Sequence, residues 1–183
     1  MKRRDLLKGG AALGVAGMRP GSLLARDWPK HDAGQARVVL LHTNDTHSRL
    51  DPFPMDGGRY EGLAGVARRK TLIDRVRAAE EHVLVVDCGD VFQGTPYFNF
   101  YKGVADYLAM SRLGYDLVTL GNHDFDSGSA ALSAAMEHAS FGFVSANLDV
   151  DAGALAKPVV PYFVKTFTTK GAIAPIRLGV FGL

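Results

Sequence analysis

The feature that most constrains this chain is an alternation of short apolar runs with amphipathic stretches. Apolar runs rich in β-branched residues predict strands at residues 37–43, 82–87, 115–120 and 141–148. Between them, apolar side chains recur at helical spacing in residues 62–81, 97–114 and 127–139. Strands that alternate with helices are typical of a layered α/β fold with a parallel sheet. A further strand is predicted at residues 176–183.

The composition agrees with a folded domain and argues against several functions. Of the 183 residues, 47% are hydrophobic and 22% are charged, which suffices for one domain with a sizeable core. Residues 1–25 contain five of the 21 basic and one of the 19 acidic side chains, which leaves 16 basic and 18 acidic. A slightly acidic body lacks the basic stripe of a nucleic-acid scaffold. The single Cys88 excludes an internal disulfide framework.

Residues 1–25 are predicted to be an export signal. The basic pair Arg3 and Arg4, placed before a short apolar stretch, resembles the twin-arginine signal. The prediction is export by the twin-arginine machinery to the periplasm or to the outside of the cell, without a stable membrane anchor. The alternative is a basic tail that has no targeting role. Residues 26–36 are interpreted as a linker, and residues 37–183 as the folded domain.

Polar clusters directly follow the first three predicted strands. Asp45 and His47 follow the first strand, Asp90 follows the second, and residues 121–128, GNHDFDSG, follow the third. Because ligands bind at the carboxyl ends of strands in open α/β sheets, we expect these clusters to meet at one edge. Their carboxylate, imidazole and amide donors suit a divalent transition metal such as manganese, iron or zinc. A central Asp90 is suited to bridge two ions about 3.5–4 Å apart.

Each cluster alone has a simpler interpretation as a polar turn. The three together, in this order and each at the end of a strand, favour a joint metal site. Cys88 is expected to be a small packed side chain near that site rather than a nucleophile. Residues 49–60, rich in proline and glycine, are expected to form an ordered loop at the active site. Several aromatic residues are expected to pack the second helix and its entry rather than to stack on a base: Phe92, Phe98, Phe100, Tyr101 and Tyr107.

The same motifs carry a resemblance to a known family. DTH, GD and GNHD, in this order, resemble the motifs of the calcineurin-like metallophosphoesterases. The longer strings LLHTNDTHSRL, VDCGDVFQGTP, TLGNHDFD and SANL resemble the branch of 5′-nucleotidases and 2′,3′-cyclic-nucleotide phosphodiesterases. The resemblance covers residues 37–183. It implies a layered α-β-β-α sandwich, of which this chain would supply the first half, the N-terminal part of the catalytic domain.

The resemblance also implies the metal ligands. Asp45 and His47 would bind a first divalent ion, and Asp90 would bridge it to a second. Asn122 would bind the second ion. The implied cofactor is therefore a pair of manganese, zinc or iron ions, and the implied partner is a small phosphate ester.

The catalytic groups implied by the resemblance lie in the GNHDFDSG segment. His123 would stabilise the transferring phosphoryl group or protonate the leaving oxygen, and Asp126 would orient its ring. The neighbouring Asp124 is expected to stabilise the loop. The implied reaction is hydrolysis of a nucleoside 5′-monophosphate or cyclic nucleotide by a hydroxide that bridges the two metals.

The family pattern is matched only in part. The family has further histidine ligands after GNHD, including a Gly-His-x-His or Gly-His-x-Gln motif, and a separate C-terminal domain that grips the nucleotide base. Neither is found among these 183 residues. A chain with four of its expected ligands is predicted to bind metal loosely and to have little or no activity by itself. Two alternatives stay open: a dimanganese hydrolase that cleaves protein-bound thiosulfonate, and a non-catalytic metal-binding remnant.

Overall fold

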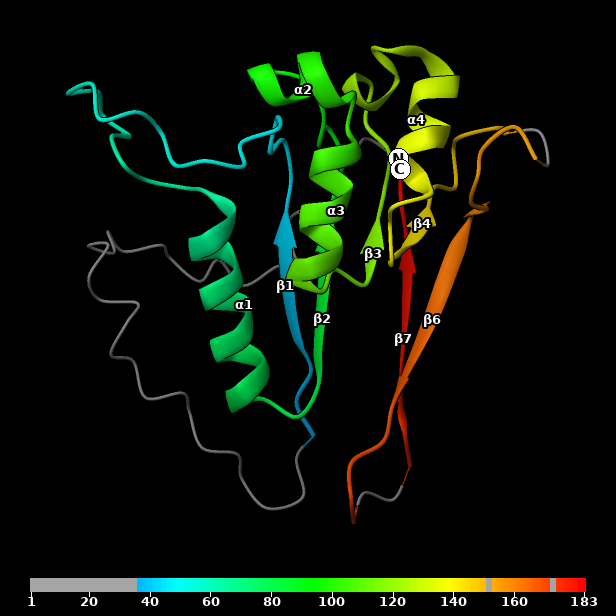
Figure 1. The fold of residues 1–183 in the computed structure, drawn as a ribbon. Helices are drawn as coiled ribbons and strands as arrows, with labels where there is room; N and C mark the ends of the chain where they lie inside the picture. Colours follow the sequence, from blue (N-terminus) through cyan, green and yellow to red (C-terminus); the bar gives the residue numbers. More distant parts are fainter. Residues whose placement is uncertain (1–35, 151–152, 172–173) are drawn as a thin grey trace, which may run out of the picture. The chain divides into compact units, whose positions relative to one another are not determined.

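The first five strands form one parallel sheet (Figure 1). The computed structural model describes residues 36–150, 153–171 and 174–183. The strands of this sheet pair in chain order, all in parallel: β1 (Val39–Thr43), β2 (Val83–Asp87), β3 (Leu117–Val118), β4 (Gly142–Val144) and β5 (Val159–Val160). The predicted α/β fold with a parallel sheet is confirmed, although β3 and β4 are shorter than the apolar runs that contain them.

The connections between these strands carry the helices. They are α1 (Val66–Ala79), α2 (Pro96–Tyr101), α3 (Val104–Leu113), the short 3-10 helix η3 (His123–Phe125) and α4 (Gly128–Met136). Helix α3 contacts both α1 and α4. The core forms where these helices meet the sheet, and its members include Ile73 of α1, Val85 of β2, Tyr107 of α3, Leu132 of α4 and Phe143 of β4. The loops that follow the strands lie at the carboxyl edge of the sheet.

The helix predicted over residues 97–114 is interrupted. Lys102 and Gly103 adopt left-handed backbone conformations, with φ of 50° and 91°, and separate α2 from α3. Gly103 packs closely on the buried Phe92, because a Cβ there would lie 2.1 Å from its ring. The helix predicted from residue 62 begins only at Val66, since Gly65 before it has a φ of 88°.

A second, antiparallel sheet consists of β6 (Tyr162–Phe167) and β7 (Ile176–Phe181). The strand predicted at residues 176–183 is therefore present, but its partner β6 was not anticipated. The nitrogen of Ala146 donates to the carbonyl of Gly182 at 2.7 Å, so the end of this hairpin meets the loop after β4.

The predicted export signal, and the predicted linker up to residue 35, lie outside the described residues. Among the residues that the structure describes, no helix has both the length and the apolar character needed to span a bilayer.

Candidate metal centre

The loops after β1 and β2 run side by side, as a continuation of the pairing between these strands. The nitrogen of Asp45 donates to the carbonyl of Gly89 at 3.0 Å, and the nitrogen of His47 to that of Asp90 at 3.2 Å. The nitrogen of Ser48 then donates to the carbonyl of Val91 at 2.7 Å. These bonds hold Asp45 and His47 beside Asp90, although more than forty residues separate them along the chain.

Unusual backbone conformations gather in the same two loops. Left-handed φ is uncommon for residues other than glycine, and it persists only where the surroundings enforce it. In the loop after β1, Asp45, His47 and Ser48 have φ of 50°, 47° and 50°. In the loop after β2, Asp90 and Gln93 have φ of 53° and 72°. Both loops are therefore held in backbone conformations that are unfavourable in free energy and that fix the directions of their polar side chains.

The loop after β3 approaches the other two through a pair of glycines. A Cβ on Gly121 would lie 2.2 Å from Oδ1 of Asp90, and a Cβ on Gly89 would lie 2.6 Å from the nitrogen of Gly121. Only residues without side chains allow this approach. It brings the nitrogen of His123 within 2.9 Å of Oδ1 of Asp90, to which it donates.

Asp124 fastens this third loop to the second. Its buried carboxylate accepts hydrogen bonds from the nitrogens of Gly121 at 2.8 Å, Val91 at 3.1 Å, and Asp90 and Phe92 at 3.2 Å. Burial is the main reason that its pKa is raised to about 6, and the hydrogen bonds from Gly121 and Phe92 act in the opposite direction. The expectation that Asp124 stabilises the loop agrees with these bonds.

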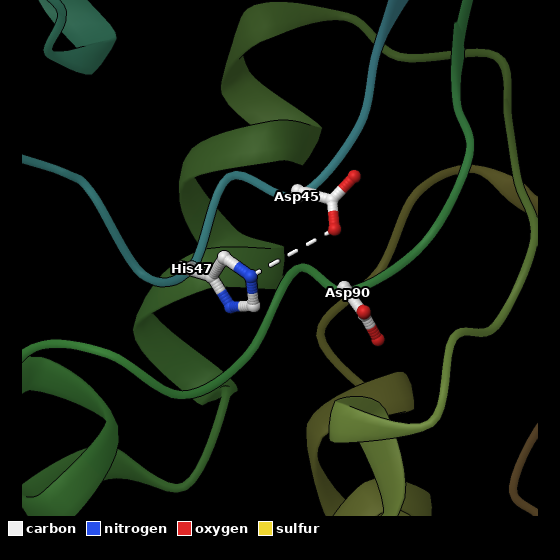
Figure 2. A group of neighbouring side chains, drawn as sticks. All are labelled: Asp45, His47 and Asp90. Atoms are coloured by element: carbon white, nitrogen blue, oxygen red, sulfur yellow. Dashed lines mark ion pairs between the residues drawn. The ribbon is translucent and has the colours of Figure 1, made fainter.

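Three side chains converge as a result. Asp45, His47 and Asp90 each offer a ligand atom, and these atoms all lie within 4.8 Å of one another (Figure 2). Nε2 of His47 lies 3.8 Å from Oδ1 of Asp45. Nδ1 of His47 lies 3.1 Å from the carbonyl of Phe92, which can only accept, so Nδ1 carries the proton. The lone pair of Nε2 therefore faces the carboxylates, as a metal ligand requires.

The donor set fits a divalent cation. Two carboxylates and one neutral imidazole suit zinc, manganese or iron, and no thiolate takes part. Nδ2 of Asn44 donates to Oδ2 of Asp45 at 2.5 Å, which supports that carboxylate from behind. Asn122 is exposed at the start of η3, directly before His123.

His123 and Asp126 form a pair next to this group. Nδ1 of His123 lies 2.8 Å from Oδ2 of Asp126. The hydrogen bond to Asp126 is the main reason that the pKa of His123 is raised, and burial works against it. The rings of His123 and His47 lie 5.3 Å apart, in an edge-to-face arrangement. His123, Asp126 and the three converging residues are therefore brought to one edge of the sheet.

Two buried acidic residues, Asp87 and Asp106, hydrogen-bond to residues in or next to these loops. The sequence motifs did not indicate either role. Oδ2 of Asp87 accepts from Oγ1 of Thr43 at 2.5 Å, and its Oδ1 accepts from the nitrogen of Gly89. Asp106, on α3, accepts from Oγ of the buried Ser48 at 3.1 Å. Desolvation raises the pKa of Asp106 to about 7. One sequence signal could have identified Asp106, namely a carboxylate on the apolar face of a predicted helix.

Two expectations about other residues need correction. Cys88 is exposed rather than packed. Desolvation and the neighbouring Asp87 and Asp45 raise the pKa of its thiol, which opposes a nucleophilic role. Phe92, Phe98 and Tyr107 are buried as predicted, but two aromatic residues are not: Phe100 is 80% exposed and Tyr101 is 54% exposed.

Comparisons with known proteins agree with this geometry. The family model of the calcineurin-like phosphoesterases matches residues 38–178. The snake venom 5′-nucleotidase of Gloydius brevicauda is 45% identical over 120 residues, which cover 63% of this chain and 20% of that protein. The 5′-nucleotidase of Homo sapiens is 39% identical over 146 residues, which cover 75% of this chain and 25% of that protein.

Solved structures show the same relationship. The crystal structure of a 5′-nucleotidase precursor from Thermus thermophilus superposes with a TM-score of 0.67 at 42% identity, over 80% of this chain and 28% of that one. The chain thus spans about a fifth to a quarter of the length of the curated relatives it matches. From the family model, the shared fold and the converging side chains, this chain belongs to the calcineurin-like phosphoesterase family.

Proposed function

We propose that the full-length protein hydrolyses phosphate esters, with nucleoside 5′-monophosphates or cyclic nucleotides as substrates, at a centre of two divalent metal ions. The observation that carries the proposal is the convergence of Asp45, His47 and Asp90 within 4.8 Å. Membership of the family supports the reaction class. The 5′-nucleotidases among the relatives support a nucleotide as the substrate.

In this proposal the metal ligands come from all three loops. Asp45 and His47 would hold the first ion, Asn122 would hold the second, and Asp90 would serve both. Two bound ions supply Lewis acidity and a water that is deprotonated near neutral pH. Asp90 is suited to a central position because both neighbouring loops are fixed around it, through its backbone carbonyl and through Oδ1.

The proposed role of His123 is to meet the phosphate ester. Since Asp126 lies at Nδ1, that nitrogen carries a proton and Nε2 is directed away from Asp126. A protonated His123 donates from Nε2 to a phosphoryl oxygen or gives its proton to the leaving oxygen. Asp126 acts by orienting the ring and by favouring its protonated form.

The proposal includes export of the protein before it acts. The basic pair Arg3 and Arg4 supports recognition by the twin-arginine machinery, which carries folded proteins. These 183 residues contain a single cysteine and so need no disulfide among themselves before export, which suits this route. Replacing both arginines by lysine in the full-length protein is expected to stop its export, as measured by cell fractionation. Unchanged export of this variant would contradict the proposed signal.

Phosphate release by the purified full-length protein tests the chemistry. A chelator is expected to abolish release from adenosine 5′-monophosphate, and manganese or zinc to restore it. His123→Asn is expected to lower kcat by about 10²- to 10⁴-fold, the usual contribution of a positioned acid or base. Asp126→Asn is expected to lower kcat less, because the imidazole remains.

His138→Asn is the matched control for these variants. His138 is exposed just after α4 and belongs to none of the three loops, so its replacement should leave turnover unchanged. Wild-type turnover by His123→Asn, or full activity of the chelated protein, would overturn the proposed mechanism.

A further inference from the structure

The residue that follows His47 is held by hydrogen bonds on its nitrogen, its carbonyl and its hydroxyl. Ser48 is fully buried, and its φ of 50° is left-handed. Its nitrogen donates to the carbonyl of Val91 at 2.7 Å, and its carbonyl accepts from Oγ1 of Thr95 at 2.9 Å. Its hydroxyl donates to Oδ2 of Asp106 at 3.1 Å. Ser48 is therefore fixed by the loop after β2, by the residue before α2 and by α3.

This anchor limits where the ring of His47 can lie. His47 itself has a left-handed φ of 47°, which persists only where the surroundings enforce it. Gly94 packs against it, because a Cβ on Gly94 would lie 3.0 Å from Cβ of His47. Nδ1 of the ring lies 3.1 Å from the carbonyl of Phe92. The ring is thus held between the loop after β2 and the turn at Ser48, with Nε2 toward the carboxylate of Asp45 (Figure 2).

Asp106 ties this turn to the hydrophobic core. It lies in the first turn of α3 and is 2% exposed. Its neighbours Tyr107 and Met110 on the same helix are core residues, so the helix is a rigid support for the carboxylate. The hydrogen bond from Ser48 joins residues that are 58 positions apart in the sequence. The position of the turn beside His47 therefore depends on a contact with α3.

The carboxylate of Asp106 is costly for the stability of the fold at neutral pH. Desolvation raises its pKa to about 7, and the hydrogen bond from Ser48 acts in the opposite direction without offsetting the desolvation. A negative charge in the first turn of a helix is favourable, but an exposed side chain would serve that purpose without the cost of burial. A buried group that costs stability and points at a candidate site indicates a functional role rather than a packing role.

We propose that Asp106 is a positioning residue for the metal centre, which fixes, through the hydroxyl of Ser48, the turn that directs Nε2 of His47 at the metal ion. The inference rests on the proposed function, because it takes His47 as a metal ligand. Asp106 is not among the converging donor atoms, so it acts only through Ser48. Loss of this contact should weaken metal binding although every ligand is still present.

Zinc binding by the full-length protein, measured by calorimetry, tests the inference. Asp106→Ala and Ser48→Ala remove the acceptor and the donor of the same hydrogen bond. Each should lower zinc affinity about tenfold, as for other groups that support a metal ligand. The double variant should bind zinc no more weakly than either single variant, because only one contact is lost. Asp106→Asn removes the charge but keeps an acceptor oxygen, so it should retain the wild-type affinity.

Three results of this titration would overturn the inference. They are unchanged affinity in both alanine variants, additive losses in the double variant, and a loss in Asp106→Asn equal to that in Asp106→Ala. An equal loss in the asparagine variant would assign the effect to charge rather than to the hydrogen bond.

Ser111→Ala is the matched control for a purely structural effect. Ser111 lies on the same helix, with its hydroxyl 2.7 Å from the carbonyl of Tyr107 and 3.0 Å from that of His138, away from the loops of the metal centre. Its replacement should lower the free energy of unfolding and leave zinc affinity unchanged. If zinc affinity falls in this variant as well, Asp106→Ala acts by a general loosening of the fold, and the inference is overturned.

NMR of the metal-free protein, labelled at the histidine ring nitrogens, separates this inference from the proposed function. In wild type and in Asp106→Asn, His47 should carry its proton on Nδ1, toward the carbonyl of Phe92. In Asp106→Ala the ring should populate both tautomers, because its orientation is no longer fixed. Unchanged protonation of Nδ1 in Asp106→Ala would overturn the inference even if the protein binds zinc and hydrolyses an ester. Wild type that binds no zinc would contradict the proposed function, while the expected change of tautomer would still support the positioning role of Asp106.

Discussion

Adding one methyl group at Gly121 tests how the candidate metal centre is held together. A Cβ there would lie 2.2 Å from Oδ1 of Asp90 and 2.5 Å from its nitrogen. The nitrogen cannot easily move aside, because it donates to the buried Asp124. Overpacking of this kind costs about 1–3 kcal/mol, and contact with backbone favours the upper part of that range. Alanine also restricts the unfolded chain, which offsets about 0.4–1 kcal/mol.

We therefore expect Gly121→Ala to lower the free energy of unfolding by about 2 kcal/mol in urea titrations. Zinc affinity, measured by calorimetry, should fall at least about tenfold, because the carboxylate of Asp90 must shift. Gly179→Ala is the matched control: nothing lies within 4 Å of its Cβ position, and its φ is ordinary. This control should change stability by no more than about 0.5–1 kcal/mol. Equal effects of the two variants, or unchanged zinc binding in Gly121→Ala, would refute the reasoning.

Three further variants test other parts of the structure. Asp106 has its pKa raised to about 7 by desolvation, with Asp124 adding to the effect and Ser48 and Arg69 opposing it. Its contribution to stability is therefore present below about pH 4 and lost as pH rises through 7. Between pH 5 and 8, Asp106→Asn should become more stable than wild type in thermal melts, by up to about 4 kcal/mol. A stability difference that does not grow with pH would contradict this. The hydroxyl of Tyr107 is buried without a hydrogen-bond partner among the described residues. Tyr107→Phe should therefore raise the free energy of unfolding by about 1 kcal/mol in urea titrations. A loss of stability would show that the hydroxyl does form a hydrogen bond. Gly103→Ala places a Cβ 2.1 Å from the ring of Phe92. By the same measurement it should lower the free energy of unfolding by about 2–4 kcal/mol. A near-neutral effect would mean that the turn between α2 and α3 adapts to the new side chain.

The sheet and the composition of the site could be predicted because both depend on local sequence. The apolar runs before Asn44, Cys88 and Gly121 identify the strands, and their parallel order places the loops that follow at one edge. The glycines of GNHD and DCGD indicate sharp turns, and the structure explains them by the close contact between Gly89 and Gly121. Asp45, His47 and Asp90 could therefore be expected to meet from the sequence alone.

Features that depend on tertiary contacts could not be predicted. The break between α2 and α3 lies at Lys102 and Gly103, where Gly103 packs on the ring of Phe92, and helical periodicity carries no sign of that contact. Strand β6 was missed although its run YFVKTF, rich in aromatic and β-branched residues, was an available strand signal. The exposure of Phe100 and Tyr101 on α2 was likewise not visible in the sequence pattern.

The central claim is that Asp45, His47 and Asp90 bind a metal ion together. Anomalous diffraction at the zinc edge, from crystals of the full-length protein grown with zinc, tests it most directly. We expect an anomalous peak about 2.0–2.2 Å from a carboxylate oxygen of Asp45, Nε2 of His47 and a carboxylate oxygen of Asp90. The peak should be lost in Asp90→Asn and retained in Asp74→Asn, whose side chain pairs with Lys70 on the exposed face of α1. Zinc bound only at other residues, or no peak in zinc-saturated crystals, would contradict the account.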